Sequence, residues 1–278
     1  MLVLIFSSYA SNNQESMKRQ KFFYLFVICT FIAVNSMAQT NGRAIYTTIL
    51  ESEDFKKLRG ELIFSENKSL FFFNADTIAD DDDYQSVNMQ GPSTLDFEFS
   101  FGESLVSYHE VFIDKRKKEI LSSERYYKDG KEHSCLTIEP TNIFVWNITD
   151  ETKEIGSFQS TKATTTFRGR NYTAWFTTEV SVSSGPWKFH GLPGLILEIY
   201  DDEMGVQFLL SSIDIPFEST RKIEPPNSGE RISIEEYAKY QSKLADEIVE
   251  LIKAKLPRGA NVSKISATQT NKGIEREF

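Results

Sequence analysis

Cysteine and histidine are scarce in this sequence. Its 278 residues include two cysteines and three histidines. The histidines, His109, His133 and His190, form neither a His-x-x-x-His nor a His-Glu-x-x-His pattern, so no zinc site is indicated. The Gly-x-Ser-x-Gly elbow of many serine hydrolases is also missing. These absences favour a protein that is not an enzyme, and they indicate no metal and no other cofactor.

Basic residues are in the minority. The chain has 31 lysines and arginines against 40 aspartates and glutamates, and its formal net charge is −9. A protein of this charge has no general attraction to nucleic acid or to an anionic membrane surface. Nucleic acid is therefore not an expected partner.

Long apolar runs are rare as well, and the clearest one, residues 22–34, lies near the start of the chain. It is shorter than the ~20 residues that a bilayer span requires. Basic residues precede it and the small residues Ser36 and Ala38 follow it, which predicts a secretory signal peptide over residues 1–38. Because that leader is unusually long, we interpret residues 1–16 as lying upstream of the true start at Met17.

Cys135 is the one cysteine that follows the predicted cleavage site, since Cys29 lies within the apolar run. We therefore expect no internal disulfide and a buried, unreactive Cys135. No cysteine adjoins the cleavage site, so we do not expect a lipoprotein. The mature chain is predicted to be exported to the periplasm or the outer membrane, without an integral membrane segment.

Residues 39–257 have the pattern of one mainly β domain. Aromatic residues make up 13% of the chain, including 22 phenylalanines, and such side chains suit a pleated surface. Short apolar stretches separated by turns predict strands at 43–50, 61–64, 69–73, 97–101, 104–113, 119–127, 134–138, 143–148, 171–182, 195–200 and 206–213. Because no helices alternate with them, the sheet should be curved and antiparallel, either an open sheet or a half barrel.

One amphipathic helix is predicted at residues 234–255, and it should pack on the sheet. Ser233 and Glu236 form a capping box at its start, and Pro257 follows its end. The aspartate-rich stretch 76–83 reads as a solvated loop, and residues 258–278 as a polar tail.

The most constrained stretch runs from Gly185 to Tyr200 and reads Gly-Pro-Trp-Lys-Phe-His-Gly-Leu-Pro-Gly-Leu-Ile-Leu-Glu-Ile-Tyr. Gly185-Pro186 and Pro193-Gly194 are both strong turn signals. We therefore expect a tight loop that docks its aromatic side chains against the sheet and then enters a central strand.

This stretch resembles the GLPGLI family of bacterial envelope proteins, named for the sequence that residues 191–196 spell. Flanking segments between about residues 146 and 201 also look like that family, including Phe167-Arg168-Gly169-Arg170 and Ala174-Trp175-Phe176-Thr177. The resemblance implies an exported, β-rich protein whose biochemical activity is uncharacterised.

Six residues near the motif are candidates for binding. Arg168 and Arg170 could clamp a carboxylate or a phosphate, or they could pair with acidic residues of the chain itself. The aromatic rings could line a cleft or fill the core, and His190 could be held by a backbone carbonyl. The full set is Arg168, Arg170, Trp175, Trp187, Phe189 and His190.

Three functions remain open from the sequence. The first is a secreted, non-enzymatic binding protein that holds an apolar ligand or an envelope protein on the concave face of the sheet. The second is a hydrolase that uses His190 or the pair Cys135 and His133, which share one face of a predicted strand. The third is an interaction protein of the outer-membrane machinery.

Overall fold

The computed structural model describes residues 41–50, 56–73, 95–102, 110–129, 131–227, 229–255 and 262–270. The chain divides into two compact units, Met1–Gln39 and Thr40–Phe278, and every described residue belongs to the second. The predicted leader and the aspartate-rich loop lie outside the described residues. So do residues 104–109 of one predicted strand.

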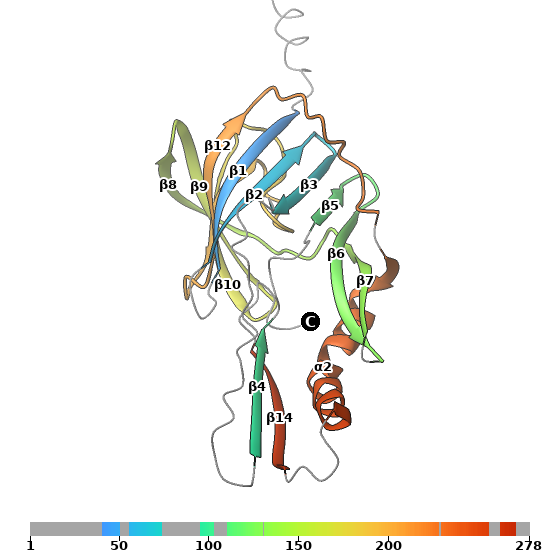
Figure 1. The fold of residues 1–278 in the computed structure, drawn as a ribbon. Helices are drawn as coiled ribbons and strands as arrows, with labels where there is room; N and C mark the ends of the chain where they lie inside the picture. Colours follow the sequence, from blue (N-terminus) through green and yellow to red (C-terminus); the bar gives the residue numbers. More distant parts are fainter. Residues whose placement is uncertain are drawn as a thin grey trace, which may run out of the picture. The chain divides into compact units, whose positions relative to one another are not determined.

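A 12-stranded sheet dominates the fold (Figure 1). Its strand order is β13-β7-β6-β5-β3-β2-β1-β12-β11-β10-β9-β8, so β13 and β8 form its edges. The strands are β1 Gly42–Leu50, β2 Lys56–Phe64, β3 Lys68–Phe73, β5 Glu110–Asp114, β6 Glu119–Lys128, β7 Lys131–Pro140, β8 Asn147–Ile155, β9 Phe158–Phe167, β10 Arg170–Thr177, β11 Leu195–Asp201, β12 Val206–Asp214 and β13 Glu230–Ser233. All neighbours pair antiparallel except β13 and β7. The predicted mainly β architecture is confirmed.

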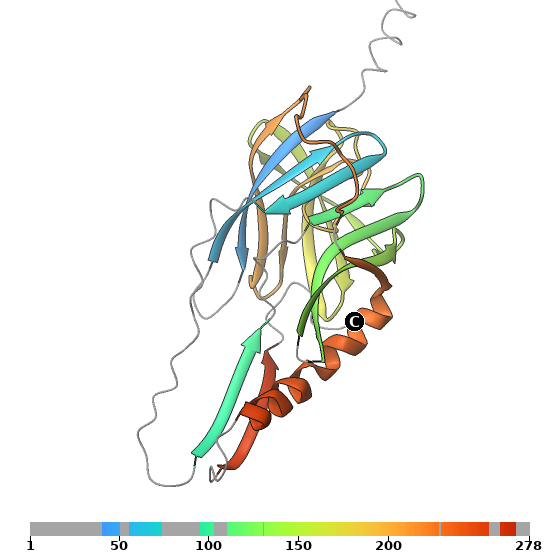
Figure 2. The ribbon, with the colours of Figure 1, turned by 45° about the vertical axis from the view of Figure 1, so that its right-hand side comes forward.

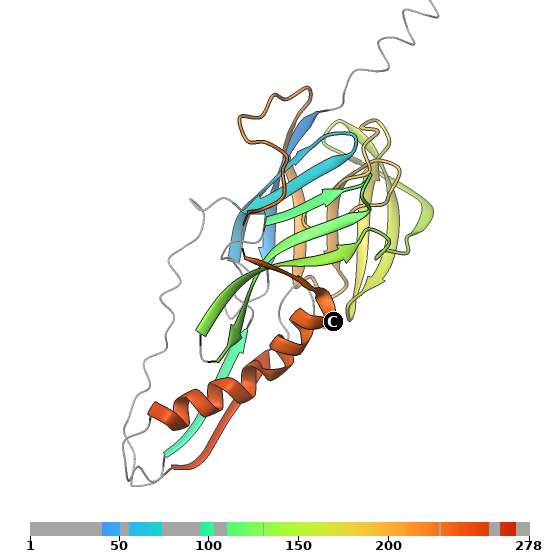
Figure 3. The same cartoon turned by 90° about the vertical axis from the view of Figure 1, so that its right-hand side faces the viewer.

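The sheet is strongly curved, as the views in Figures 2 and 3 show. The register shifts at Ile45/Tyr46 between β1 and β12, and at Trp175/Phe176 between β10 and β11. Such bulges bend a strand and increase its twist. They therefore contribute to the curvature that gives the sheet a concave face.

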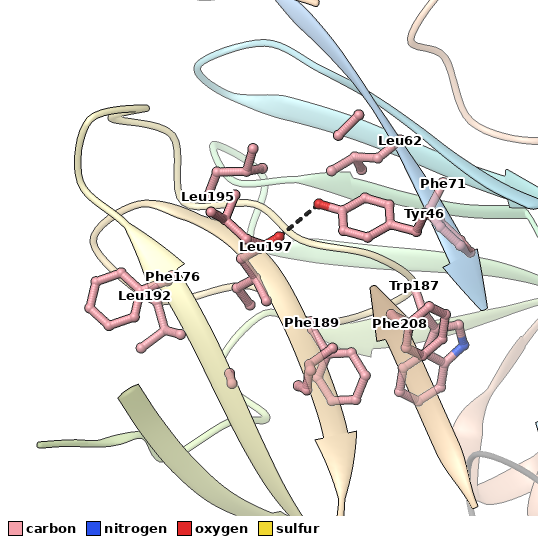
Figure 4. Close-up of a cluster of buried hydrophobic side chains, with 14 of the residues drawn as sticks. Tyr46, Leu62, Phe71, Phe176, Trp187, Phe189, Leu192, Leu195, Leu197 and Phe208 are labelled. Carbon is pink, nitrogen blue, oxygen red and sulfur yellow. Dashed lines mark hydrogen bonds between the residues drawn. The ribbon is translucent and has the colours of Figure 1, made fainter. Parts of the chain in front are cut away.

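The main hydrophobic core lies on the concave face. Alternate residues of β1 show the period of two, because Ala44, Tyr46 and Leu50 are buried while their neighbours are half-buried. The connection from β10 to β11, residues 178–194, contributes Trp187, Phe189 and other side chains to the same core. We call this connection the motif loop. Figure 4 shows its rings beside Phe208 of β12.

The opposite face of the sheet has a smaller apolar cluster of its own. Leu70, Phe112 and Leu121 come from β3, β5 and β6, and Ile223 of the connection between β12 and β13 packs against them. Arg221 lies over the Phe72 ring at 4.0 Å from the guanidinium carbon to the ring centroid. The connection thus covers apolar side chains that the outer face would otherwise expose.

Helix α2 spans Ile234–Lys255, the range that the sequence predicts. The Ser233 side chain accepts a hydrogen bond from the Glu236 amide at 3.2 Å, as expected of an N-cap. Tyr237 packs with Tyr126 and Cys135 of the sheet, and the Gln241 amide donates to the Arg125 carbonyl. The predicted packing of the helix on the sheet is therefore confirmed for its first half.

The structure also departs from the predicted elements. Residues 143–146 are not in a strand, and β8 begins only at Asn147, because this segment crosses over the motif loop instead. Strand β13 lies where the sequence predicts no strand, and β10 ends at Thr177 instead of continuing to residue 182. Part of the predicted polar tail forms β14, Val262–Thr270, which pairs in parallel with β4, Leu95–Gly102, as a separate two-stranded sheet.

Gly194 is required by a close backbone approach where the motif loop enters β11. A Cβ atom there would lie 2.0 Å from the Thr177 carbonyl oxygen, and that backbone atom could not move without disturbing β10. We expect Gly194→Ala to lower the free energy of unfolding by about 3 kcal/mol, measured by urea denaturation.

Gly156→Ala provides the matched control. Its Cβ would meet nothing within 4 Å, although its φ of +60° carries the usual strain. That variant should lose only about 1 kcal/mol. Equal losses from the two variants would show that the close approach at Gly194 contributes nothing.

Candidate functional site

The motif loop is fixed to the sheet by its own backbone. The Ile196 amide donates to the Ser184 carbonyl at 2.9 Å, and the Leu195 amide donates to the Val180 carbonyl at 3.2 Å. The Tyr46 hydroxyl reaches across from β1 and donates to the Ile196 carbonyl at 2.7 Å, the bond dashed in Figure 4. The start of β11 is therefore held both by the loop and by the middle of the sheet.

Trp187 and Phe189 lie inside the core. Their exposed fractions are 5% and 0%. Phe189 makes edge contacts with Trp187 and Tyr172, with ring centroids 5.1 Å and 4.9 Å apart. Of the two alternatives that the sequence left open, core packing describes these two rings better than the lining of a cleft.

Trp187 adopts a backbone conformation that is unusual for a bulky residue. Its φ is 52°, in the left-handed region, which costs about 1–3 kcal/mol unless the surroundings enforce it. The ring contacts of Trp187 and the ion pair of the next residue supply that enforcement. This strain marks the motif loop as a segment shaped by tertiary contacts rather than by local preference.

Both ring nitrogens of His190 face backbone carbonyl oxygens. Nδ1 lies 2.7 Å from the Lys188 oxygen and Nε2 lies 2.8 Å from the Thr141 oxygen. Burial lowers the pKa of His190, and the two carbonyl contacts oppose that shift. Trp146 donates from Nε1 to the His190 carbonyl at 2.8 Å. His190 thus joins the motif loop to the segment after β7, and neither nitrogen is open to a substrate.

A buried carboxylate holds two cations beside this histidine. Glu139 of β7 is 1% exposed, and its Oε1 lies 2.5 Å from the ammonium of Lys188, which is 0% exposed. The other oxygen of Glu139 pairs with the Arg168 guanidinium, from the turn between β9 and β10. Such a group of charges tolerates burial only when the partners are close and well placed.

Arg170 is likewise paired within the chain. Its guanidinium contacts the Asp201 carboxylate, and the two side chains are 1% and 2% exposed. The other Asp201 oxygen accepts the Val206 amide at 2.8 Å, where β12 begins. Lys162, the third cation near this stretch, pairs with Glu151 at 2.9 Å. Of the two alternatives for these cations, the structure favours pairing within the chain over a ligand clamp.

Trp175 is not brought together with the other candidate residues. It lies on the opposite face of the sheet, where its Nε1 is 3.2 Å from the Tyr200 hydroxyl. The Lys153 ammonium sits 4.5 Å from the centroid of its ring and forms an ion pair with Glu198 at 2.5 Å. The structure therefore places Trp175 alone on the outer face. The other five candidates form an interior group: Arg168, Arg170, Trp187, Phe189 and His190.

Cys135 and His133 differ in exposure, although both lie on β7. Cys135 is fully buried and His133 is exposed, with its ring stacked on Tyr126. Burial, reinforced by Glu124, raises the pKa of Cys135 to about 12. A thiol in that state supplies little thiolate near neutral pH and is poorly suited to nucleophilic attack.

Two buried residues beside this interior group, Lys188 and Glu139, were not predicted from the sequence. Lys188 is the one charged residue between Pro186 and His190, and that isolation was the available signal. Its partner Glu139 lies 49 residues earlier in the chain, so no local pattern connects them. Among the described residues, there is no cluster of three or more metal-binding side chains.

The motif region matches one family model. That model, described as a protein of unknown function (Porph_ging), covers residues 167–198, from the end of β9 through the motif loop into β11. The match relates this region, rather than the whole chain, to the family. No curated protein matches the chain. Within the described residues, none of the helices has the length and apolar character needed to cross a membrane.

Solved structures show only distant similarity. Two structures of PNGF-II, in different space groups, share 16% identity with the chain and give TM-scores of 0.48 and 0.45. Each match covers 74% of this chain, which spans 34% and 33% of the length of those structures. A putative outer membrane lipoprotein-sorting protein domain from Vibrio parahaemolyticus matches 64% of this chain and 87% of its own, with 8% identity and a TM-score of 0.22.

The buried charges predict unequal effects of two substitutions. Glu139→Gln leaves Lys188 buried without its counter-charge, so we expect a loss of about 3–5 kcal/mol in the free energy of unfolding. Lys188→Met should cost less, because Glu139 keeps its contact with Arg168. Urea denaturation of both variants measures the difference. A larger loss from Lys188→Met would contradict a network organised by Glu139.

The raised pKa of Cys135 predicts slow alkylation. A folded-state pKa of about 12 keeps the group as a neutral thiol at pH 8, whereas an exposed cysteine is partly ionised there. Iodoacetamide should therefore modify the native protein at least about 100-fold more slowly than the protein unfolded in urea. Mass spectrometry follows the reaction, and equal rates in the two states would refute the assignment.

Proposed function

We propose that this protein is an exported, envelope-associated member of the GLPGLI family that binds its partner without catalysis, through its outer surface. Export is supported by the basic and apolar composition of residues 18–34 and by the small residues at positions 36 and 38. The resemblance of the motif region to that family supports membership. Residues 167–198 match a family model described as a protein of unknown function, which is consistent with an uncharacterised activity.

One observation carries the preference for an outer surface. The motif loop places Trp187, Phe189 and Leu192 in the core on the concave face, where a bound apolar ligand would otherwise lie. These side chains are 5%, 0% and 1% exposed. An apolar molecule in this place would have to displace the loop, together with the buried pair of Lys188 and Glu139.

The chemistry of the interior supports binding over hydrolysis. His190 uses both ring nitrogens on carbonyl groups, and burial raises the pKa of Cys135 far above neutral. Arg168 and Arg170 contact carboxylates of the chain itself. The residues that could catalyse hydrolysis or bind an anion are thus engaged in contacts that stabilise the fold.

A single preparation tests both parts of this proposal. The full chain is produced in a Gram-negative host, purified from the periplasm and weighed by native mass spectrometry. We expect a chain that begins at Gln39 and carries no bound apolar molecule. Leu25→Arg, which interrupts the apolar run, should leave the protein unprocessed in the cytoplasm.

Two results would overturn the proposal separately. Recovery of the unprocessed wild type in the cytoplasm would rule out export by this leader. A bound lipid-like mass that survives gentle purification would restore the concave face as a ligand site.

A further inference from the structure

The turn between β5 and β6 presents a basic cluster in this acidic protein. Residues 115–118 read Lys-Arg-Lys-Lys, and Lys68 begins the neighbouring strand β3 opposite Asp114. Arg116, Lys117 and Lys118 are all exposed. Within the described part of the chain, no carboxylate forms an ion pair with any of these three side chains. The arginines and lysines around the motif loop, by contrast, are paired.

The backbone of this basic turn is held in place. Oδ1 of the buried Asp114 accepts hydrogen bonds from the Arg116 and Lys117 amides, each at 3.1 Å. The Lys115 amide donates to the Asn67 carbonyl at 2.9 Å, and the Lys118 carbonyl accepts from the Thr141 amide at 3.3 Å. The turn therefore lies beside the β2–β3 turn, as Figures 1 and 2 show. These hydrogen bonds hold the backbone that carries the exposed cations.

Lys115 is half-buried beneath the turn and does not belong to the exposed group of Arg116, Lys117 and Lys118. Its ammonium donates to the Glu66 carbonyl at 3.0 Å. Burial lowers its pKa to about 8, so at neutral pH it still adds positive charge beneath the turn. Within residues 65–68 and 114–119, which form these two turns, the acids are Asp114, which caps the turn, and Glu66 and Glu119. Five cations against these three carboxylates leave the two turns with an excess of positive charge.

We propose that this basic turn docks the protein on an anionic lipid surface. Lysine acts as a compact point charge without the paired geometry that a specific carboxylate pocket demands, and three of the four turn residues are lysines. Exposed cations of this kind suit the irregular array of phosphates on a membrane. The remainder of the acidic chain is repelled from that surface, so contact is restricted to this end of the sheet.

This inference deepens the proposed function by naming the outer surface and its partner. It rests on export only for its biological setting, since that places the protein beside a membrane. The binding itself can be measured on Thr40–Phe278, which forms a compact unit without the leader. Failure to bind would therefore leave the question of export untouched.

The experiment is sedimentation with vesicles that contain either phosphatidylcholine alone or a mixture with 30% phosphatidylglycerol. Thr40–Phe278 should bind only the anionic vesicles, and binding should weaken as salt rises to about 0.5 M. Arg116→Glu/Lys117→Glu should lower the partition coefficient at least about tenfold. Circular dichroism melting confirms that each variant is folded, and Arg116→Gln/Lys117→Gln replaces any variant that is not.

Lys239→Glu/Lys243→Glu is the matched control. These exposed lysines lie on α2, and their reversal changes the net charge by the same amount. The control should bind almost as well as the parent protein. Equal loss in both double variants would show a net-charge effect and overturn the assignment to the turn. Absence of binding to anionic vesicles, or binding to polyglutamate in its place, would overturn the lipid partner.

Discussion

The carboxylate of Glu139 is the constraint on which the motif region depends. It comes from β7, and it meets Lys188 from the motif loop and Arg168 from the turn after β9. Three segments that are distant in sequence are therefore tied at one buried point. Separation of these charges would leave an uncompensated ion in the core, so movement of the loop away from the sheet would cost substantial free energy.

That constraint explains why the most distinctive stretch of the sequence is an interior feature. The aromatic rings, the buried lysine and His190 all serve to seat the loop against the concave face, while strain at Trp187 is balanced by the same contacts. A distinctive sequence motif is often interpreted as a binding site. Here the apolar and aromatic side chains of the loop occupy the concave face of the sheet, the place that a bound ligand would otherwise fill.

The sequence predicts this fold well where the signal is local. The alternation in β1, the hairpin of β2 and β3, and the capped helix α2 each depend on neighbouring residues. Prediction fails where long-range contacts decide. Residues 143–146 look like a strand, yet the Trp146 bond to His190 and the packing of Phe144 on Phe189 draw them away from the sheet. The partners of Arg168, Arg170 and Lys188 could not be found either, since no local spacing connects them to Glu139 or Asp201.

The paired interior also makes the exposed basic turn more informative. A protein with net charge −9 offers abundant carboxylates, and the cations near the motif each find one. Arg116, Lys117 and Lys118 are presented instead on a rigid turn that a buried aspartate caps. Four basic residues in succession would have been visible in the sequence as a motif, but their meaning depends on exposure and on the lack of nearby partners in the described chain. The proposed lipid contact therefore depends on charges that face water, whereas the motif loop belongs to the interior of the sheet.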